Sequence, residues 1–110
     1  MAKNLDLVLL LDCYGELMTD RQRDVAELYY NDDLSLTEIA QMREITRQAV
    51  RDSLRRTEVF LVDTEHKLGM ASRLCAMRRC LEDIESICSS DSPDCGKILE
   101  LARKGLRLLS

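Results

Sequence analysis

The stretch that decides the fold is Ser35-Leu-Thr-Glu-Ile-Ala40, followed after a short interval by Ile45-Thr-Arg-Gln-Ala-Val50. Ser35 and Glu38 have the spacing of a capping box, in which each side chain accepts a hydrogen bond from the backbone N–H of the other residue. This predicts a short helix that ends near residue 43. A break around Glu44 follows, and Thr46 is suited to cap the next helix.

Two helices joined by so short a break predict a helix-turn-helix. The motif needs a small residue where the helices cross, apolar residues that fix their angle, and a second helix with a polar outer face. Ala40 is the small residue at the crossing. The apolar positions follow in order: Leu36, Ile39, Ala40, Ile45, Val50 and Leu54. We expect the core of the motif at about residues 19–56.

The outer face of the second helix carries the candidate binding residues. An arginine can fork onto guanine or phosphate, and a glutamine can pair with adenine. The nucleic-acid-binding residues predicted on this basis are Thr46, Arg47, Gln48, Arg51 and Arg55. Two other interpretations stay open, because arginines on an exposed helix also serve as a solvated face or as partners of nearby acidic helices. Asp52 lies on the same face and would repel phosphate.

The rest of the chain predicts further helices and no strands. The sequence has one Pro, four Gly and 4% aromatic residues, so few positions interrupt a helix. An apolar helix is expected from Asn4 to about residue 17, and a Thr19–Gln22 capping box opens a second helix.

A long helix is then expected over 47–68 and another over 70–88, each with apolar residues at alternating spacings of four and three. Gly69 between them predicts that these two helices form an antiparallel hairpin. A last helix is expected to begin with Ser92 as N-cap and Pro93 in its first turn. Its predicted apolar face is Ile98, Leu101, Ala102, Leu106 and Leu109. The fold class is therefore all-α, a helix-turn-helix whose long recognition helix continues into an antiparallel helical hairpin. We expect a single domain over 1–110, in which the hairpin and the last helix occupy about 57–110.

The charge pattern sets limits on nucleic-acid binding. The chain has a net charge of −4, yet residues 43–56 hold five arginines against two acidic residues. Because an acidic body repels phosphate at long range, tight non-specific binding is not expected.

The sequence also argues against an enzyme. Its four glycines stand apart and form no phosphate-binding loop, and the lone His66 has no partner at a catalytic spacing. The five cysteines include no CxxC pair, so we expect reduced thiols, with Cys13, Cys80 and Cys88 in the core, and no metal or cofactor. The apolar run at 7–11 lacks the flanks of an export signal and is too short to span a bilayer, so we expect a cytoplasmic protein without membrane insertion.

A family resemblance adds to these predictions. The segment Thr19-Asp-Arg-Gln-Arg-Asp-Val-Ala-Glu-Leu-Tyr-Tyr30, together with the two stretches quoted first, resembles region 4 of bacterial sigma factors. The apolar start and the charged helix after Val50 make the chain resemble the YlxM family of small helix-turn-helix proteins more closely. That resemblance implies a protein, often dimeric, that is linked to the signal recognition particle (SRP) pathway. The first function hypothesis is then a nucleic-acid-binding regulator whose basic face meets DNA or SRP RNA. The alternative is an adapter that modulates the SRP GTPase without contacting nucleic acid.

Two further expectations concern assembly and the turn. The first helix is apolar on several sides, which together with the resemblance predicts a homodimer. The chain departs from the family at Glu44, where Gly or Asn is usual. Because that position often takes a positive φ, we expect a strained or reshaped turn.

Overall fold

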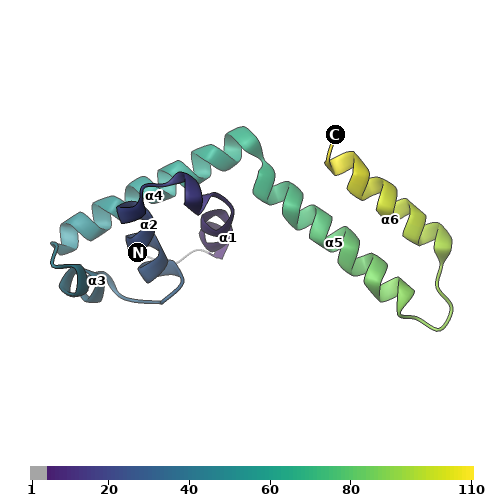
Figure 1. Ribbon diagram of the computed structural model, residues 1–110, viewed down its shortest axis with the longest axis horizontal. Helices are drawn as coiled ribbons and strands as arrows, with labels where there is room; N and C mark the ends of the chain where they lie inside the picture. The colour runs from purple at the N-terminus through teal and green to yellow at the C-terminus, as the bar shows by residue number, and fades with distance from the viewer. Residues whose placement is uncertain (1–4) are drawn as a thin grey trace. The chain divides into compact units, whose positions relative to one another are not determined.

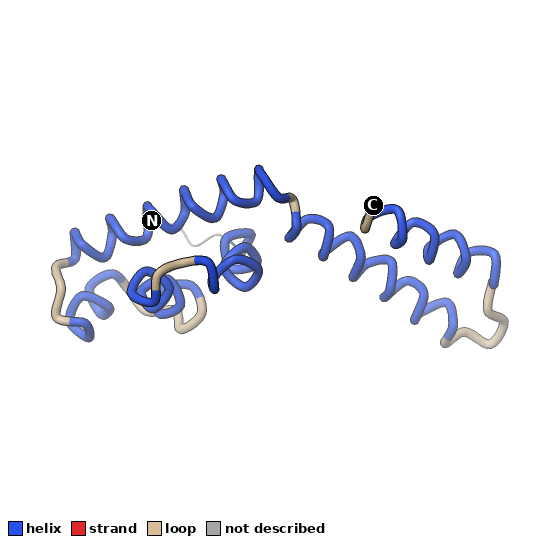
Figure 2. Tube along the Cα trace, turned by 45° about the horizontal axis from the view of Figure 1, so that its top comes forward, coloured by secondary structure: helices blue, strands red, loops and turns tan. Residues whose placement is uncertain are grey.

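The computed structural model describes residues 5–110, and every regular element within that range is a helix (Figures 1 and 2). The elements are α1 (Leu5–Tyr14), the short 3-10 helix η1 (Gly15–Leu17), α2 (Asp20–Tyr30), α3 (Leu36–Arg43), α4 (Arg47–Leu68), α5 (Met70–Cys88) and α6 (Cys95–Leu108). The all-α class is confirmed. The predicted helix start at Asn4 lies outside the described residues.

Local capping sets where α2 and α3 begin. The Thr19 hydroxyl accepts a hydrogen bond from the backbone N–H of Gln22 at 3.2 Å. Ser35 and Glu38 form the complete capping box, with both backbone-to-side-chain hydrogen bonds at 3.1 Å. These bonds satisfy N–H groups that the first turn of a helix leaves without a partner. Both caps were predicted from the sequence.

The chain divides into two compact units, Met1–Leu68 and Gly69–Ser110. In the first unit α4 packs against α1, α2 and α3, and Figure 1 shows these helices gathered along it. The residues of α4 that face them are completely buried: Val50, Leu54, Thr57 and Leu61. The apolar row predicted along residues 47–68 is therefore used within this unit.

Buried tyrosines complete the core of the first unit. Tyr14 is 2% exposed and donates a hydrogen bond from its hydroxyl to Oε1 of Glu65 at 2.5 Å, which links α1 to α4. Tyr29 and Tyr30 meet edge to face, with ring centroids 5.0 Å apart. Burial, and secondarily the negative charge of Glu58, raises the pKa of Tyr30 to about 12.

The second unit consists of α5 paired with α6, a pairing that the sequence analysis did not predict. The antiparallel pair that the sequence had suggested, residues 47–68 with 70–88, would join the two units and stays a prediction. Within the first unit the apolar row of α4 packs on α1, α2 and α3. Whether the two units behave as the single predicted domain stays a prediction.

The start and the inner face of α6 also differ from the prediction. Asp94 is the N-cap, since its carboxylate accepts a hydrogen bond from the backbone N–H of Lys97 at 3.1 Å. Ser92 and Pro93 therefore precede the helix. The row that is half-buried against α5 is Ile98, Leu101, Gly105 and Leu108. Leu106 and Leu109, which were expected in that row, are 65% and 69% exposed.

Candidate nucleic-acid interface

The turn between α3 and α4 contains a residue in the left-handed conformation, which is unfavourable for a glutamate. Glu44 has φ 56° and ψ 43°, in the left-handed region, and its backbone N–H donates to the carbonyl of Ala40. The N–H of Ile45 donates to the same carbonyl at 3.0 Å. These two bonds end α3 and direct the chain into α4, so the predicted positive φ is confirmed.

The buried side of the motif fixes the angle between α3 and α4. Ile39, Val50 and Leu54 are each 0% exposed, and Leu36 and Ala40 are also buried. Ile45, in the turn, is half-buried. A close-packed apolar contact of this kind holds the two helices rigidly. The predicted core of the helix-turn-helix is therefore present.

Thr46 positions the first turn of α4. Its hydroxyl accepts a hydrogen bond from the backbone N–H of Ala49 at 3.0 Å, which makes it the predicted N-cap. The side chain is exposed. Thr46 therefore lies at the positive end of the helix dipole, beside the first arginine of the row.

The arginine row is exposed and without acidic partners among the described residues. Arg47, Arg51 and Arg55 follow one another at intervals of four residues, so they lie on one side of α4, one turn apart. None of them takes part in an ion pair with a described residue, although other arginines do. Arg56, which the sequence analysis left out of this face, is exposed beside Arg55. The interpretation of the row as partners of the acidic first helices finds no support here.

Arg43 has a different role from the other arginines of the basic segment. Its guanidinium donates two hydrogen bonds to Asp24, from Nε at 2.7 Å and from Nη2 at 3.0 Å. The hydrogen bonds from Arg43 lower the pKa of the Asp24 carboxyl and raise the pKa of the guanidinium itself. The charge of Arg43 is thus paired with a carboxylate of the same chain. No local sequence pattern indicated this contact, because the two residues are 19 positions apart.

Gln48 and Asp52 interact with each other. The Gln48 amide donates to Oδ1 of Asp52 at 3.0 Å, one turn along α4. Gln48 must therefore exchange this bond in order to read a base. The same bond occupies the carboxylate that the sequence analysis considered repulsive to phosphate.

The outer face of α4 changes character after Arg56. Val59 and Val62 are 66% and 54% exposed, and acidic side chains stand beside them. Together they line a shallow hollow formed by Glu58, Val59, Val62, Asp63 and His66. The arginines of α4 are therefore confined to its first three turns, whereas Lys67 near its end pairs with Asp63. Three turns are about the length that a recognition helix inserts into a major groove.

Other chemistries find no support in residues 5–110. They include no group of three or more His, Cys, Asp or Glu side chains placed to hold a metal ion. No helix in that range has the length and apolar character needed to cross a bilayer. The five cysteines are free thiols, with Cys80 buried and Cys13 half-buried. Cys88 is exposed, contrary to the prediction, because it lies at the last residue of α5, where the helix gives way to a loop.

Known proteins resemble this chain over most of its length. The model of the UPF0122 family, described as "Putative helix-turn-helix protein, YlxM / p13 like", matches residues 1–100. A UPF0122 protein of Acetivibrio thermocellus is 41% identical over 105 residues, which cover 91% of this chain and 90% of the relative. UPF0122 proteins of Desulforamulus reducens and Clostridium kluyveri are 47% identical over 76 residues and 50% identical over 70 residues. These matches cover 69% and 64% of this chain, and they span 65% and 63% of the two relatives, just under two thirds.

Proposed function

Because the chain belongs to the UPF0122 family of helix-turn-helix proteins, we propose that it is a regulatory protein that binds nucleic acid through the first three turns of α4. The observation that carries the proposal is the row of Arg47, Arg51 and Arg55, which is exposed and has no acidic partner among the described residues. Thr46 and Gln48 flank that row and supply hydrogen-bonding groups. Guanidinium groups placed one turn apart suit contacts to phosphates and to guanine edges in a groove.

The proposed setting is the SRP pathway in the cytoplasm, which the resemblance to YlxM proteins implies. The ligand is then DNA or the RNA of the particle. The net charge of −4 favours a selective, modest affinity over tight non-specific binding, because the acidic remainder of the protein opposes approach to a polyanion. The protein acts as a homodimer in this proposal, and it has no catalytic role.

A titration at two salt concentrations tests this function. Fluorescently labelled SRP RNA and a duplex DNA of similar length are each titrated with the protein at about 50 mM and about 200 mM salt. We expect the affinity for one of them to fall steeply with salt, because each arginine that neutralises a phosphate releases a counterion. Absence of binding to both at low salt would overturn the proposal.

A protein-binding adapter that modulates the SRP GTPase is the second candidate. The observation that favours it is the hollow on the outer face of α4, where Val59 and Val62 are exposed on a protein surface. A Val59→Ser, Val62→Ser variant separates the two functions. It should abolish a response of the SRP GTPase in the adapter case and leave binding to nucleic acid unchanged in the other.

A further inference from the structure

The α5–α6 hairpin holds almost no buried side chains. No residue of α6 is buried, and in α5 only Ala71 and Cys80 are. Two helices of 19 and 14 residues that bury so few side chains against each other have only marginal stability in water. A further surface that covered the hairpin would therefore stabilise it.

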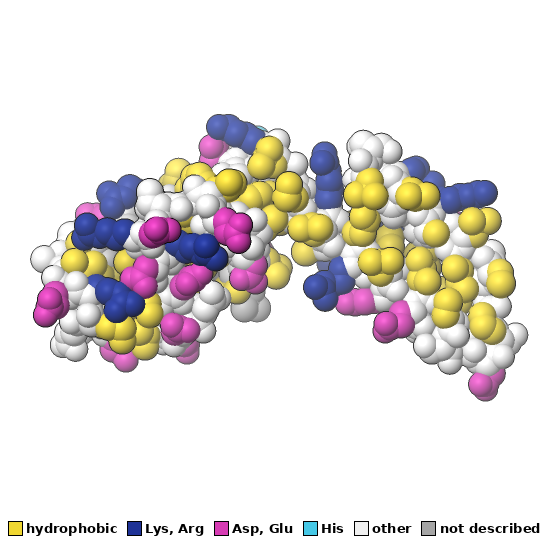
Figure 3. Space-filling view, in the orientation of Figure 1, with side chains coloured by type: hydrophobic (Ala, Val, Ile, Leu, Met, Phe, Trp, Pro, Cys, Tyr) yellow, Lys and Arg dark blue, Asp and Glu magenta, His cyan; other side chains and the backbone are white. Residues whose placement is uncertain are grey.

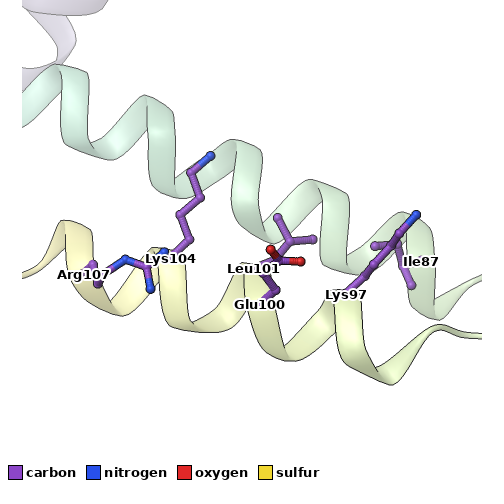
Figure 4. Close-up of a pocket in the computed structure, with 6 residues that line it drawn as sticks. All are labelled: Ile87, Lys97, Glu100, Leu101, Lys104 and Arg107. Atoms are coloured by element: carbon purple, nitrogen blue, oxygen red, sulfur yellow. The ribbon is translucent and has the colours of Figure 1, made fainter.

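Three rows of side chains follow the length of α6. Ile98, Leu101, Gly105 and Leu108 form the half-buried row that faces α5. One residue further on, an exposed apolar row follows, consisting of Leu99, Ala102, Leu106 and Leu109. On the other side of the helix lies a charged row, formed by Lys97, Glu100, Lys104 and Arg107, which Figure 4 shows beside α5. With 3.6 residues per turn, an offset of two residues places the charged row and the exposed apolar row on opposite sides.

The exposed apolar row of α6 continues onto α5. Cys80 is buried and Ile84 and Ile87 are half-buried, so this inner row is the side of α5 assigned to the contact with α6. Leu74 and Leu81, which are 55% and 62% exposed, lie on the side that follows the inner row by one residue, as Glu85 does. Because α5 and α6 run in opposite directions, the same one-residue offset turns the exposed row of each helix to the same face of the hairpin. Figure 3 shows hydrophobic side chains gathered over both α5 and α6 on the face turned to the viewer.

The charges of the hairpin separate toward its two ends. The first half of α5 carries Arg73, Arg78 and Arg79, and its second half carries Glu82, Asp83 and Glu85. In the antiparallel pair the second half of α6, with Arg103, Lys104 and Arg107, lies alongside the first half of α5. Asp91 and Asp94 lie in the connection at the other end. One end of the hairpin is thus basic and the other is acidic.

From these observations we propose that the apolar face of the hairpin docks against the same face of a second copy of the chain, and that the two hairpins form an antiparallel four-helix bundle. A partner with the same pattern is complementary only when its acidic end lies over the basic end of the first copy. The required two-fold axis runs across the helices, so that α5 lies over the α5 of the partner copy and α6 over its α6. The other face-to-face arrangement places like charges together, and such contacts disfavour it.

The inference rests on the proposed homodimer and is independent of which nucleic acid is bound. Sedimentation of the full chain tests it first. We expect the wild-type protein to have twice the 12.6 kDa monomer mass, and a Leu81→Glu, Leu106→Glu variant to be monomeric at the same concentration. The matched control is Val59→Glu, which changes an equally exposed apolar residue of α4 and should leave the dimer intact. A monomeric wild-type protein would remove the homodimer itself, whereas a dimeric double variant would overturn only the surface assigned here.

Paired charge reversals test the orientation and leave the apolar side chains of the face in place. One variant reverses the basic end (Arg78→Glu, Arg103→Glu), and a second reverses the acidic end (Glu82→Arg, Glu85→Arg). Each alone should raise the dimer dissociation constant at least about tenfold, because like charges then face each other at both ends. An equimolar mixture should recover a heterodimer with nearly the wild-type constant. If either variant alone dimerises as well as the wild type, or the mixture shows no recovery, the antiparallel arrangement is wrong.

Discussion

Arg43, the last residue of α3, holds the carboxylate of Asp24 on α2 in a two-pronged contact, with donor–acceptor distances of 2.7 and 3.0 Å. The contact lies directly before the left-handed turn at Glu44. It therefore ties the first helix of the motif to the body of the protein at the point where the chain changes direction.

Replacing Asp24 with Asn should make the stability of the protein less dependent on pH. The pKa of Asp24 is lowered in the folded state from an ordinary value of 3.8, so its ionised form contributes stability at pH values above 3.8. That contribution is lost as the pH falls through the folded-state pKa. We expect Asp24→Asn to unfold at a lower urea concentration than the wild type at pH 7, and the difference to shrink below pH 3.8. Because both side chains are well exposed, the effect should be small, and a difference that grows with acidity would contradict this account.

Glu44→Gly should stabilise the protein. Glu44 holds a left-handed conformation at φ 56°, which costs a residue with a Cβ roughly 1–2 kcal/mol. Glycine adopts this conformation without that cost. Part of the benefit is offset because glycine increases the conformational entropy of the unfolded chain, so we expect the free energy of unfolding to rise by about 0.5–1 kcal/mol. Glu44→Ala is the control, since it removes the carboxylate and keeps the Cβ. An equal gain in the alanine variant would assign the effect to charge.

Thr57→Val should also stabilise the protein. The Thr57 side chain is 0% exposed in the core of the first unit, and its hydroxyl has no hydrogen-bond partner among the described residues. Valine has nearly the same shape and leaves no polar atom unsatisfied, so thermal unfolding should report a gain of about 1 kcal/mol. Thr64→Val on the same helix, at a half-buried position, should change little. A loss of stability in Thr57→Val would indicate that the hydroxyl is hydrogen-bonded in solution.

Reversing the charge of Arg51 and Arg55 should abolish binding to nucleic acid and leave the fold intact. Both side chains are exposed and unpaired among the described residues, so the melting temperature should be nearly that of the wild type. Each lost phosphate contact removes one released counterion, and the slope of log K against log salt should fall by about two units. Arg21→Glu with Lys67→Glu gives the same change in net charge elsewhere and should retain binding. Full binding by the folded Arg51→Glu, Arg55→Glu variant would show that the row is only a solvated face.

The features that the sequence predicted well are set by neighbouring residues. Thr19, the Ser35–Glu38 box and Thr46 each cap a helix within three residues of themselves, so a short stretch contains the whole interaction. The positive φ at Glu44 was expected from the family resemblance, because Gly or Asn is usual at that position.

Most of the features that it missed depend on contacts between distant segments, and the start of α6 is a local exception. Helices 47–68 and 70–88 have the same apolar spacing, and that spacing does not say which helix covers which. In the structure the apolar row of α4 is buried against α1, α2 and α3, and α5 packs against α6. The start of α6 was misplaced because Ser92-Pro93 is a good helix start, yet Asp94 competes successfully as the cap. The Asp24–Arg43 contact had no local signal at all.

The distribution of aromatic residues makes the two units optically distinguishable. The chain has three Tyr, one Phe and no Trp, and all four aromatic side chains lie at or before Phe60, in the first unit. Tyrosine fluorescence and near-ultraviolet circular dichroism therefore observe that unit alone, whereas far-ultraviolet circular dichroism observes the helices of both. Dilution below the dimer dissociation constant should thus change the far-ultraviolet signal while the tyrosine spectra remain constant, which allows the hairpin to be followed without introducing a label.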